Sequence, residues 1–343
     1  MGHIDMRYSL PSRDIIADAV EIMLETHRFD AAVFITNCNK IVPGMLMVAA
    51  RVDIPSIFIN GGPSLAGTFK GRKIDLKDLF EVVEAAKRGT MSEEELNEIG
   101  RCAMPTCGSC AGLFTANTMN ILTEALGLVL PGSSTIPAVD RRRIHVARNA
   151  GRCVMKLLEK NVCPSDILTE DAFENAIAVD MALGGSTNTI LHLIAIAKCA
   201  GVELSLQTFD EISRKVPTIT ALSPSGPYHL EDLDRAGGVP AVLKVLGDAG
   251  LIKKNCLTVT GKTVWENVKD ARVGNTDIIR PVSNSVRREG GIAILYGTLA
   301  PEGAVVKQSA VSKSMLKFKG VARVFNSEEE AFNVVVDGDN KRG

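Results

Sequence analysis

Two short segments of this chain hold the residue types most able to do chemistry. Residues 37–45 contain Cys38, and residues 105–112 contain Cys107 and Cys110. Each segment places cysteine in a turn rich in glycine or proline, beside apolar stretches. Cysteine thiolates bind soft metal centres such as iron–sulfur clusters, and turns of this kind can bring distant cysteines to one centre. We therefore interpret the two segments as halves of a single metal site.

Cys107 and Cys110 form a C-x-x-C pair whose spacing alone allows several interpretations. A structural zinc site would need a second such pair or a pair of histidines, which the sequence does not offer. A thiol redox pair would open a helix, and residues 111–126 are predicted to form one. A helix N-terminus also favours the thiolate that binds iron, so the redox and iron-binding interpretations both stay open at this point.

Lys40 follows Cys38 at the end of a predicted strand. An exposed lysine is the ordinary interpretation, but a lysine held beside a metal can carry a carbamate, which supplies oxygen ligands for a hard divalent ion. Residues 184–188 also allow two interpretations, since their glycines begin an apolar helix. Backbone N–H groups there can hold a carboxylate or phosphate, or the glycines can allow close packing. His192 is predicted to be a core residue rather than a ligand.

Composition excludes several classes of protein. The 343 residues carry a net charge of −1, which argues against a nucleic-acid surface or a basic membrane anchor. No apolar run reaches about 18 residues, and the N-terminus lacks the pattern of a signal peptide, so we expect no membrane span and a cytoplasmic location. Eight cysteines are too few for a disulfide scaffold in a chain of this length.

The elements predicted around Cys38 form a strand–helix–strand unit. Hydrophobic patterns predict strands over residues 31–36 and 54–60, separated by a helix over 43–52. A connection of this length favours a parallel pair. In open α/β sheets ligands bind at the carboxyl ends of the strands, which is where Cys38 lies. A helix over residues 12–26, with Ser12 as its N-cap, is predicted to precede this unit.

The rest of the chain is predicted to be mostly helical and then rich in strands. We expect an α/β fold whose N-terminal domain, residues 1–278, combines a parallel sheet with many helices. Residues 279–343 would begin a β-rich second domain of swivelling β/β/α, barrel-like type. Helices are predicted over 76–88, 92–102, 140–158, from 169 and over 189–200, and strands over 291–296, 304–307 and 322–325.

Several long motifs resemble one enzyme family, the dihydroxy-acid and phosphogluconate dehydratases, and in particular its dihydroxy-acid branch. The matching segments are residues 8–13, 37–47, 105–117, 184–188 and 230–238. The resemblance implies an iron–sulfur cluster (2Fe-2S or 4Fe-4S) bound by three cysteines. Cys38 and Cys110 match two of these ligands, Cys107 lies beside the second, and the third would precede Met1.

The resemblance also implies a magnesium ion close to the cluster. Lys40 matches a carbamylated lysine ligand, and Asn39 stands where the family usually has aspartate, which makes it a weaker ligand. The family's serine base and a further carboxylate ligand would lie beyond Gly343. We therefore expect no catalytic base within this sequence, and little or no turnover from this chain alone.

The implied reaction is the dehydration of 2,3-dihydroxy-3-methyl carboxylic acids to 2-oxo acids in valine and isoleucine biosynthesis. In it the cluster iron and magnesium act as Lewis acids and the serine removes a proton. The implied partner is the small dihydroxy acid, with no nucleic acid or membrane, in a homodimer or homotetramer. The alternatives are a sugar-acid dehydratase of the same family, a non-catalytic cluster-binding remnant, and a thiol redox protein using Cys107 and Cys110.

Overall fold

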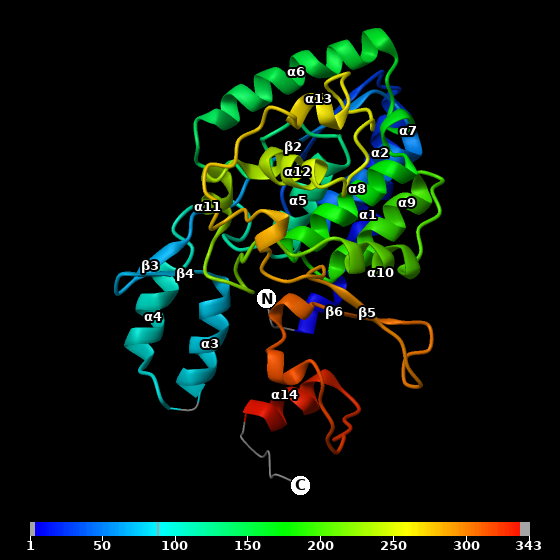
Figure 1. The fold of residues 1–343 in the computed structure, drawn as a ribbon. Coiled ribbons are helices and arrows are strands. Elements are labelled where there is room, and N and C mark those ends of the chain that lie inside the picture. The colour runs from blue at the N-terminus through cyan, green and yellow to red at the C-terminus, as the bar shows by residue number, and fades with distance from the viewer. Residues whose placement is uncertain (1–3, 88, 337–343) are drawn as a thin grey trace. The chain divides into compact units, whose positions relative to one another are not determined.

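A computed structural model describes residues 4–87 and 89–336 of the chain (Figure 1). The chain divides into two compact units. The first unit consists of the residues up to Leu65 together with Thr106–Ala310, and it holds Cys38, Lys40 and Cys110. The second unit consists of Ala66–Pro105 together with the residues from Val311 onward.

The predicted strand–helix–strand unit is present in the first unit. Strand β1 (Ala32–Thr36) is followed by helix α2 (Ile41–Val52) and strand β2 (Ser56–Asn60). The two strands pair in parallel, from Ala32 with Ser56 to Thr36 with Asn60. Alternate residues of β1 are buried and exposed, as expected where one face of a strand covers a core. Both strands therefore end at the same edge, as predicted.

Helix α1 (Pro11–His27) packs against α2. The helix itself was predicted, but Ser12 is not its N-cap. Pro11 occupies the first turn, where a missing N–H costs nothing, and the Ser12 hydroxyl donates to the Ser9 carbonyl over 2.6 Å. The prediction for Ser12 was wrong because proline at the first position moved the helix start one residue earlier.

Helix α5 (Thr115–Ala125) is buried along its whole length and packs against α2 and against three further helices. These are α8 (Glu170–Leu183), α9 (Asn188–Cys199) and α12 (Gly238–Asp248). Helix α8 begins where predicted, and Thr169 caps it by accepting a hydrogen bond from the Ala172 N–H. The remaining helices of this unit are α6 (Arg142–Lys160), α7 (Pro164–Ile167), α10 (Leu206–Lys215), α11 (Leu230–Arg235) and α13 (Val264–Val268).

The second unit begins with an antiparallel hairpin of β3 (Gly67–Phe69) and β4 (Arg72–Ile74). It continues with α3 (Leu76–Lys87) and α4 (Glu93–Cys102), and includes α14 (Glu328–Val336). Ser92 caps α4 by accepting from the Glu95 N–H over 3.2 Å. The Glu95 carboxylate pairs with Lys70 at 2.7 Å.

Two of the three strands predicted late in the chain are present. β5 (Ala293–Leu295) and β6 (Ala304–Val306) pair antiparallel within the first unit. The third was wrong, since residues 322–325 form no strand; residues 322–324 are exposed and Phe325 is half-buried. The mixed α/β class is confirmed, whereas the domain boundary at 278/279 stays a prediction, and residues 337–343 lie outside the described part. No helix in the described residues is both long and apolar enough to cross a membrane.

Candidate metal centre

Cys38 lies on the loop that joins β1 to α2, at the carboxyl end of the strand pair. Its thiol is exposed, and its carbonyl accepts the hydrogen bond from Val42 N–H that starts α2, over 3.1 Å. The preceding residue, Asn37, donates from Nδ2 to the Gly62 carbonyl oxygen over 3.1 Å. The positive end of the α2 dipole therefore faces the Cys38 loop and favours negative charge there.

Cys110 lies on a loop that reaches the same carbonyl oxygen. The preceding residue, Ser109, donates to Gly62 O from its backbone nitrogen over 3.0 Å and from its hydroxyl over 3.2 Å. Ser64 N–H in turn donates to Ser109 O over 2.8 Å. Asn37 and Ser109, each next to a candidate ligand, thus share one acceptor. The fold brings the two predicted halves of the metal site together.

The contact between the loops requires glycine at two positions. Gly62 has φ +94°, and a Cβ there would lie 2.2 Å from an Arg143 nitrogen and 2.4 Å from the Ile136 carbonyl. Gly108 has φ +131°, and its Cβ would lie 2.4 Å from Ser64 N. Both conformations are left-handed, which side chains rarely adopt. The turn glycines noticed in the sequence are therefore what allows the two backbones to approach.

The C-x-x-C pair does not open a helix. Helix α5 begins at Thr115, and the residues between Cys110 and Thr115 form a loop in which Leu113 N–H donates to Ser223 O over 2.6 Å. The prediction of a helix from residue 111 was wrong because these backbone groups bond to distant segments. The N-terminus of α5 therefore gives no reason to expect thiolate at Cys110. Between Cys38 and Cys110, the cysteine that lies close to a helix N-terminus is Cys38, which precedes α2.

Asn39 and Lys40, which directly follow Cys38 in the chain, belong to a small cluster of polar side chains. Lys40 Nζ donates to Asn39 Oδ1 over 3.1 Å, and His192 Nε2 lies 3.3 Å from the same oxygen. On the other side of the ring, His192 Nδ1 lies 3.5 Å from an Arg13 guanidinium nitrogen. His192 is fully buried, as predicted for a core residue, but it also contacts a candidate ligand.

The electrostatics of this cluster favour neutral side chains. Burial lowers the pKa of Lys40, with Arg13 acting in the same direction and Cys38 in the opposite one. Burial, together with Lys40 and Arg13, lowers the pKa of His192 to about 3. A lysine amine must be neutral to react with carbon dioxide, so the surroundings of Lys40 suit the carbamate that the family resemblance implies.

The donors present fit an iron–sulfur cluster better than a magnesium ion. Cys38 and Cys110 offer two sulfur ligands on adjoining loops, exposed and half-buried respectively. For a hard ion such as Mg²⁺, the polar side chains around Lys40 offer one oxygen, that of the Asn39 amide. This oxygen already accepts a hydrogen bond from Lys40. In the described part of the chain, no group of three or more His, Cys, Asp or Glu side chains is placed to hold a metal.

The glycine-rich segment 184–188 packs against an acidic side chain. A Cβ on Gly185 would lie 1.8 Å from Asp180 Oδ1, and the Thr189 hydroxyl donates to the other oxygen of that carboxyl group. The start of α9 is thus occupied by the protein's own carboxyl group. This arrangement favours the close-packing interpretation of the segment over an external anion site.

Sequence reasoning missed the side chains that hold the two cysteine loops. Asn117 and Asn120, on α5, are buried at 1% and 0% exposure, and each bonds to one loop, as described below. The signal was available, because two asparagines spaced three apart inside a helix predicted to be buried must find polar partners. Which loops they would meet depends on contacts between distant segments, which periodicity does not reveal.

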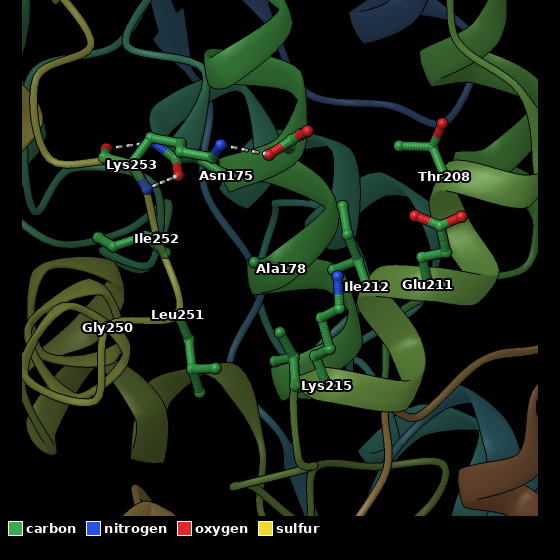
Figure 2. A pocket seen from close by; sticks show the side chains of 12 residues that line it. Asn175, Ala178, Thr208, Glu211, Ile212, Lys215, Gly250, Leu251, Ile252 and Lys253 are labelled. Carbon is green, nitrogen blue, oxygen red and sulfur yellow. Dashed lines mark hydrogen bonds and ion pairs between the residues drawn. The ribbon is translucent and has the colours of Figure 1, made fainter.

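A charged cleft elsewhere in the first unit is separate from this centre. Figure 2 shows this hollow of about 250 Å³, lined by residues of α8, α10 and the segment 250–253. Its Asn175 side chain is fastened to the Lys253 backbone by two bonds of 2.7 and 2.8 Å. None of Cys38, Lys40 or Cys110 lines it, so the cleft adds nothing to the metal centre.

Comparison with known proteins gives consistent matches along the whole chain. The model described as "Dihydroxy-acid/6-phosphogluconate dehydratase N-terminal" matches residues 1–267, and the corresponding C-terminal model matches 277–343. Proteins named dihydroxy-acid dehydratase from Ignicoccus hospitalis, Moorella thermoacetica and Aquifex aeolicus are 58%, 57% and 53% identical over 100% of this chain. The chain spans 62% of the length of each of these relatives.

Proposed function

Because this chain belongs to the dihydroxy-acid/6-phosphogluconate dehydratase family, we propose that it supplies the cluster-binding part of a hydro-lyase. The proposed reaction removes water from 2,3-dihydroxy-3-methyl carboxylic acids and yields 2-oxo acids for valine and isoleucine biosynthesis. The observation that carries this proposal is the shared hydrogen-bond acceptor, Gly62 O, which joins the Cys38 and Cys110 loops.

In the proposed site Cys38 and Cys110 are ligands of one iron–sulfur cluster. When bound, the cluster supplies a Lewis acid for the departing hydroxyl group of the substrate. The chain's own contribution is placement: the two loops hold their thiols at the open edge of the β1–β2 pair, and the α2 dipole favours negative charge beside Cys38. The exposure of Cys38 leaves room for a small substrate to approach.

Lys40 and Asn39 are the proposed ligands of a magnesium ion. The surroundings that lower the pKa of Lys40 favour the neutral amine, which can take up carbon dioxide and so change from cation to carboxylate-like ligand. His192 and Arg13, which both interact electrostatically with Lys40, then face an anion instead of an ammonium group. The site with a carbamylated Lys40 therefore suits a divalent ion better than the same site with an unmodified lysine.

The remaining parts of the proposal concern partners and location. We propose a cytoplasmic protein that acts on a small dihydroxy acid and assembles as a homodimer or homotetramer. The balanced charge of the chain supports a small-molecule partner over a nucleic acid.

A substrate comparison on the anaerobically reconstituted chain tests the proposed function. The cluster spectrum is recorded with 2,3-dihydroxy-3-methylbutanoate and with 6-phosphogluconate, and 2-oxo acid formation is measured in parallel. We expect the branched-chain acid to perturb the spectrum at lower concentration. The reverse order would assign the chain to sugar acids, and an unchanged spectrum with both acids would point to cluster binding without catalysis.

A further inference from the structure

Helix α5 presents two buried asparagines on one face, three residues apart and therefore one above the other. Asn117 and Asn120 are 1% and 0% exposed within a helix that is buried along its whole length. A buried amide destabilises a core unless its hydrogen bonds are made. Their partners therefore indicate what the two side chains do.

Within the described part of the chain, the Asn117 side chain bonds to the loop that carries Cys110. Its Nδ2 donates to the carbonyl oxygens of Cys110 and Gly112, the latter over 2.8 Å, and its Oδ1 accepts from the Ser109 hydroxyl over 2.6 Å. The Ser109 hydroxyl also contacts Gly62 O. One amide group thus fixes the backbone on both sides of the Cys110 side chain.

Asn120 reaches the other loop. Its Nδ2 donates to Asn37 Oδ1 over 3.2 Å, and Asn37 immediately precedes Cys38. The backbone oxygen of Asn120 accepts from Asn60 Nδ2 over 2.9 Å, so the end of β2 is tied to the same turn of α5. Asn120 Oδ1 is buried without a hydrogen-bond partner among the described residues. A buried amide oxygen without a hydrogen bond lowers stability, so core packing does not explain an asparagine at position 120. Its bond to the Cys38 loop does.

We propose that Asn117 and Asn120 are positioning residues that set the distance between the Cys38 and Cys110 thiols. One rigid helix holds both loops, so the spacing of the two sulfur atoms is fixed by the spacing of the two asparagines. This inference deepens the proposed function, because it assigns the residues that preorganise two ligands of the proposed cluster.

The test measures the thiol pair in metal-free protein. Each chain carries Cys107→Ser, so that the exposed Cys107 does not compete, and is treated with dibromobimane, a short thiol crosslinker. The yield of the Cys38–Cys110 crosslink is measured by peptide mass spectrometry. The variants are Asn117→Asp and Asn120→Asp, which keep the shape of the side chain and remove its N–H donors.

A matched control is available in α8. Asn175 is also fully buried, and Figure 2 shows its bonds to Lys253, far along the chain from either cysteine loop. Asn175→Asp therefore removes comparable buried hydrogen bonds without touching the thiol pair. Ser109→Ala and Asn37→Ala cut bonds to Asn117 and Asn120 from the loop side, and they replace the helix variants if those do not fold.

We expect the crosslink to form in the parent chain and in Asn175→Asp. In Asn117→Asp and Asn120→Asp its yield should fall about tenfold, because the effective concentration of one thiol at the other drops when either loop is released. Equal yields in all variants, or no crosslink in the parent chain, would overturn the inference. Iron uptake, measured separately, tests the proposed function: a parent chain that crosslinks but takes up no iron keeps the positioning role and refutes the cluster.

Discussion

At the scale of single residues, Gly62 connects the two halves of the candidate centre. Its carbonyl accepts from Asn37 and Ser109, and its Cα is closely enclosed by Arg143 and Ile136. The sequence showed that a glycine-rich turn follows β2 but not that its carbonyl serves both cysteine loops. The candidate ligand residues were proposed from the sequence, whereas the residues that hold their loops together were not.

Replacing Gly62 by alanine should therefore disturb both loops at once. The added Cβ combines left-handed strain of about 1–2 kcal/mol with overpacking of about 1–3 kcal/mol, so we expect a loss of about 2–5 kcal/mol in the free energy of unfolding. Urea denaturation measures it. Gly201→Ala is the control, since Gly201 has φ +72° but nothing within 4 Å, and it should lose only the strain. Equal losses in the two variants would contradict the close contact.

The buried Asp180 predicts a pH dependence of stability. Burial raises its pKa from the ordinary 3.8 to about 7, although Thr189 and Lys307 act in the opposite direction. The folded state therefore binds the proton more tightly, and this stabilisation is complete below about pH 3.8 and lost as pH rises through 7. Relative to Asp180→Asn, the unaltered chain should become less stable between pH 4 and 8.

The measurement for Asp180 is a series of denaturation curves across that pH range. The exposed Asp270 provides the control, because Asp270→Asn makes the same chemical change without altering the buried Asp180 site. A difference between the unaltered chain and Asp180→Asn that stays constant with pH would show that the Asp180 carboxyl group titrates alike in the folded and unfolded states.

At the scale of elements, periodicity located most helices and strands but not all their starts. The β1–α2–β2 unit was predictable, since continuous apolar strands around a proline-led helix have few other arrangements. The start of α5 was not, because the loop before it bonds to Ser223 and Leu230, each over 100 residues away in the chain. The strand predicted at 322–325 was wrong: the structure gives these residues no strand, and residues 322–324 are exposed.

The close packing of α1 on α2 gives an element-level prediction. A Cβ at Gly44 of α2 would lie 2.7 Å from Arg13 O and 3.1 Å from an Ile16 methyl carbon. Gly44→Ala should destabilise the fold, because overpacking of about 1–3 kcal/mol outweighs the roughly 1 kcal/mol gain in helix propensity. Gly151→Ala in α6, where nothing lies within 4 Å, should stabilise by about 1 kcal/mol. Thermal unfolding shows whether each variant is more or less stable than the unaltered chain. Stabilisation of both variants would contradict the close packing of α1 on α2.

At the scale of the whole molecule, family membership and geometry support the same interpretation. The family models match residues 1–267 and 277–343, and the first unit alone holds both candidate thiols and the Lys40 cluster. The sequence predicted the α/β class and the family but not the division into units, because the second unit joins Ala66–Pro105 to residues from Val311 onward. Such a discontinuous unit leaves no boundary signal in composition.

The most direct measurement is the iron and acid-labile sulfide content of the anaerobically reconstituted chain, together with its visible absorption. The account predicts a cluster that is lost in Cys38→Ser and in Cys110→Ser, and retained in Cys163→Ser, whose half-buried thiol lies beside α7. A cluster that survives both of the first two substitutions, or that Cys163→Ser removes equally, would contradict the claim that the loops joined at Gly62 hold one metal centre.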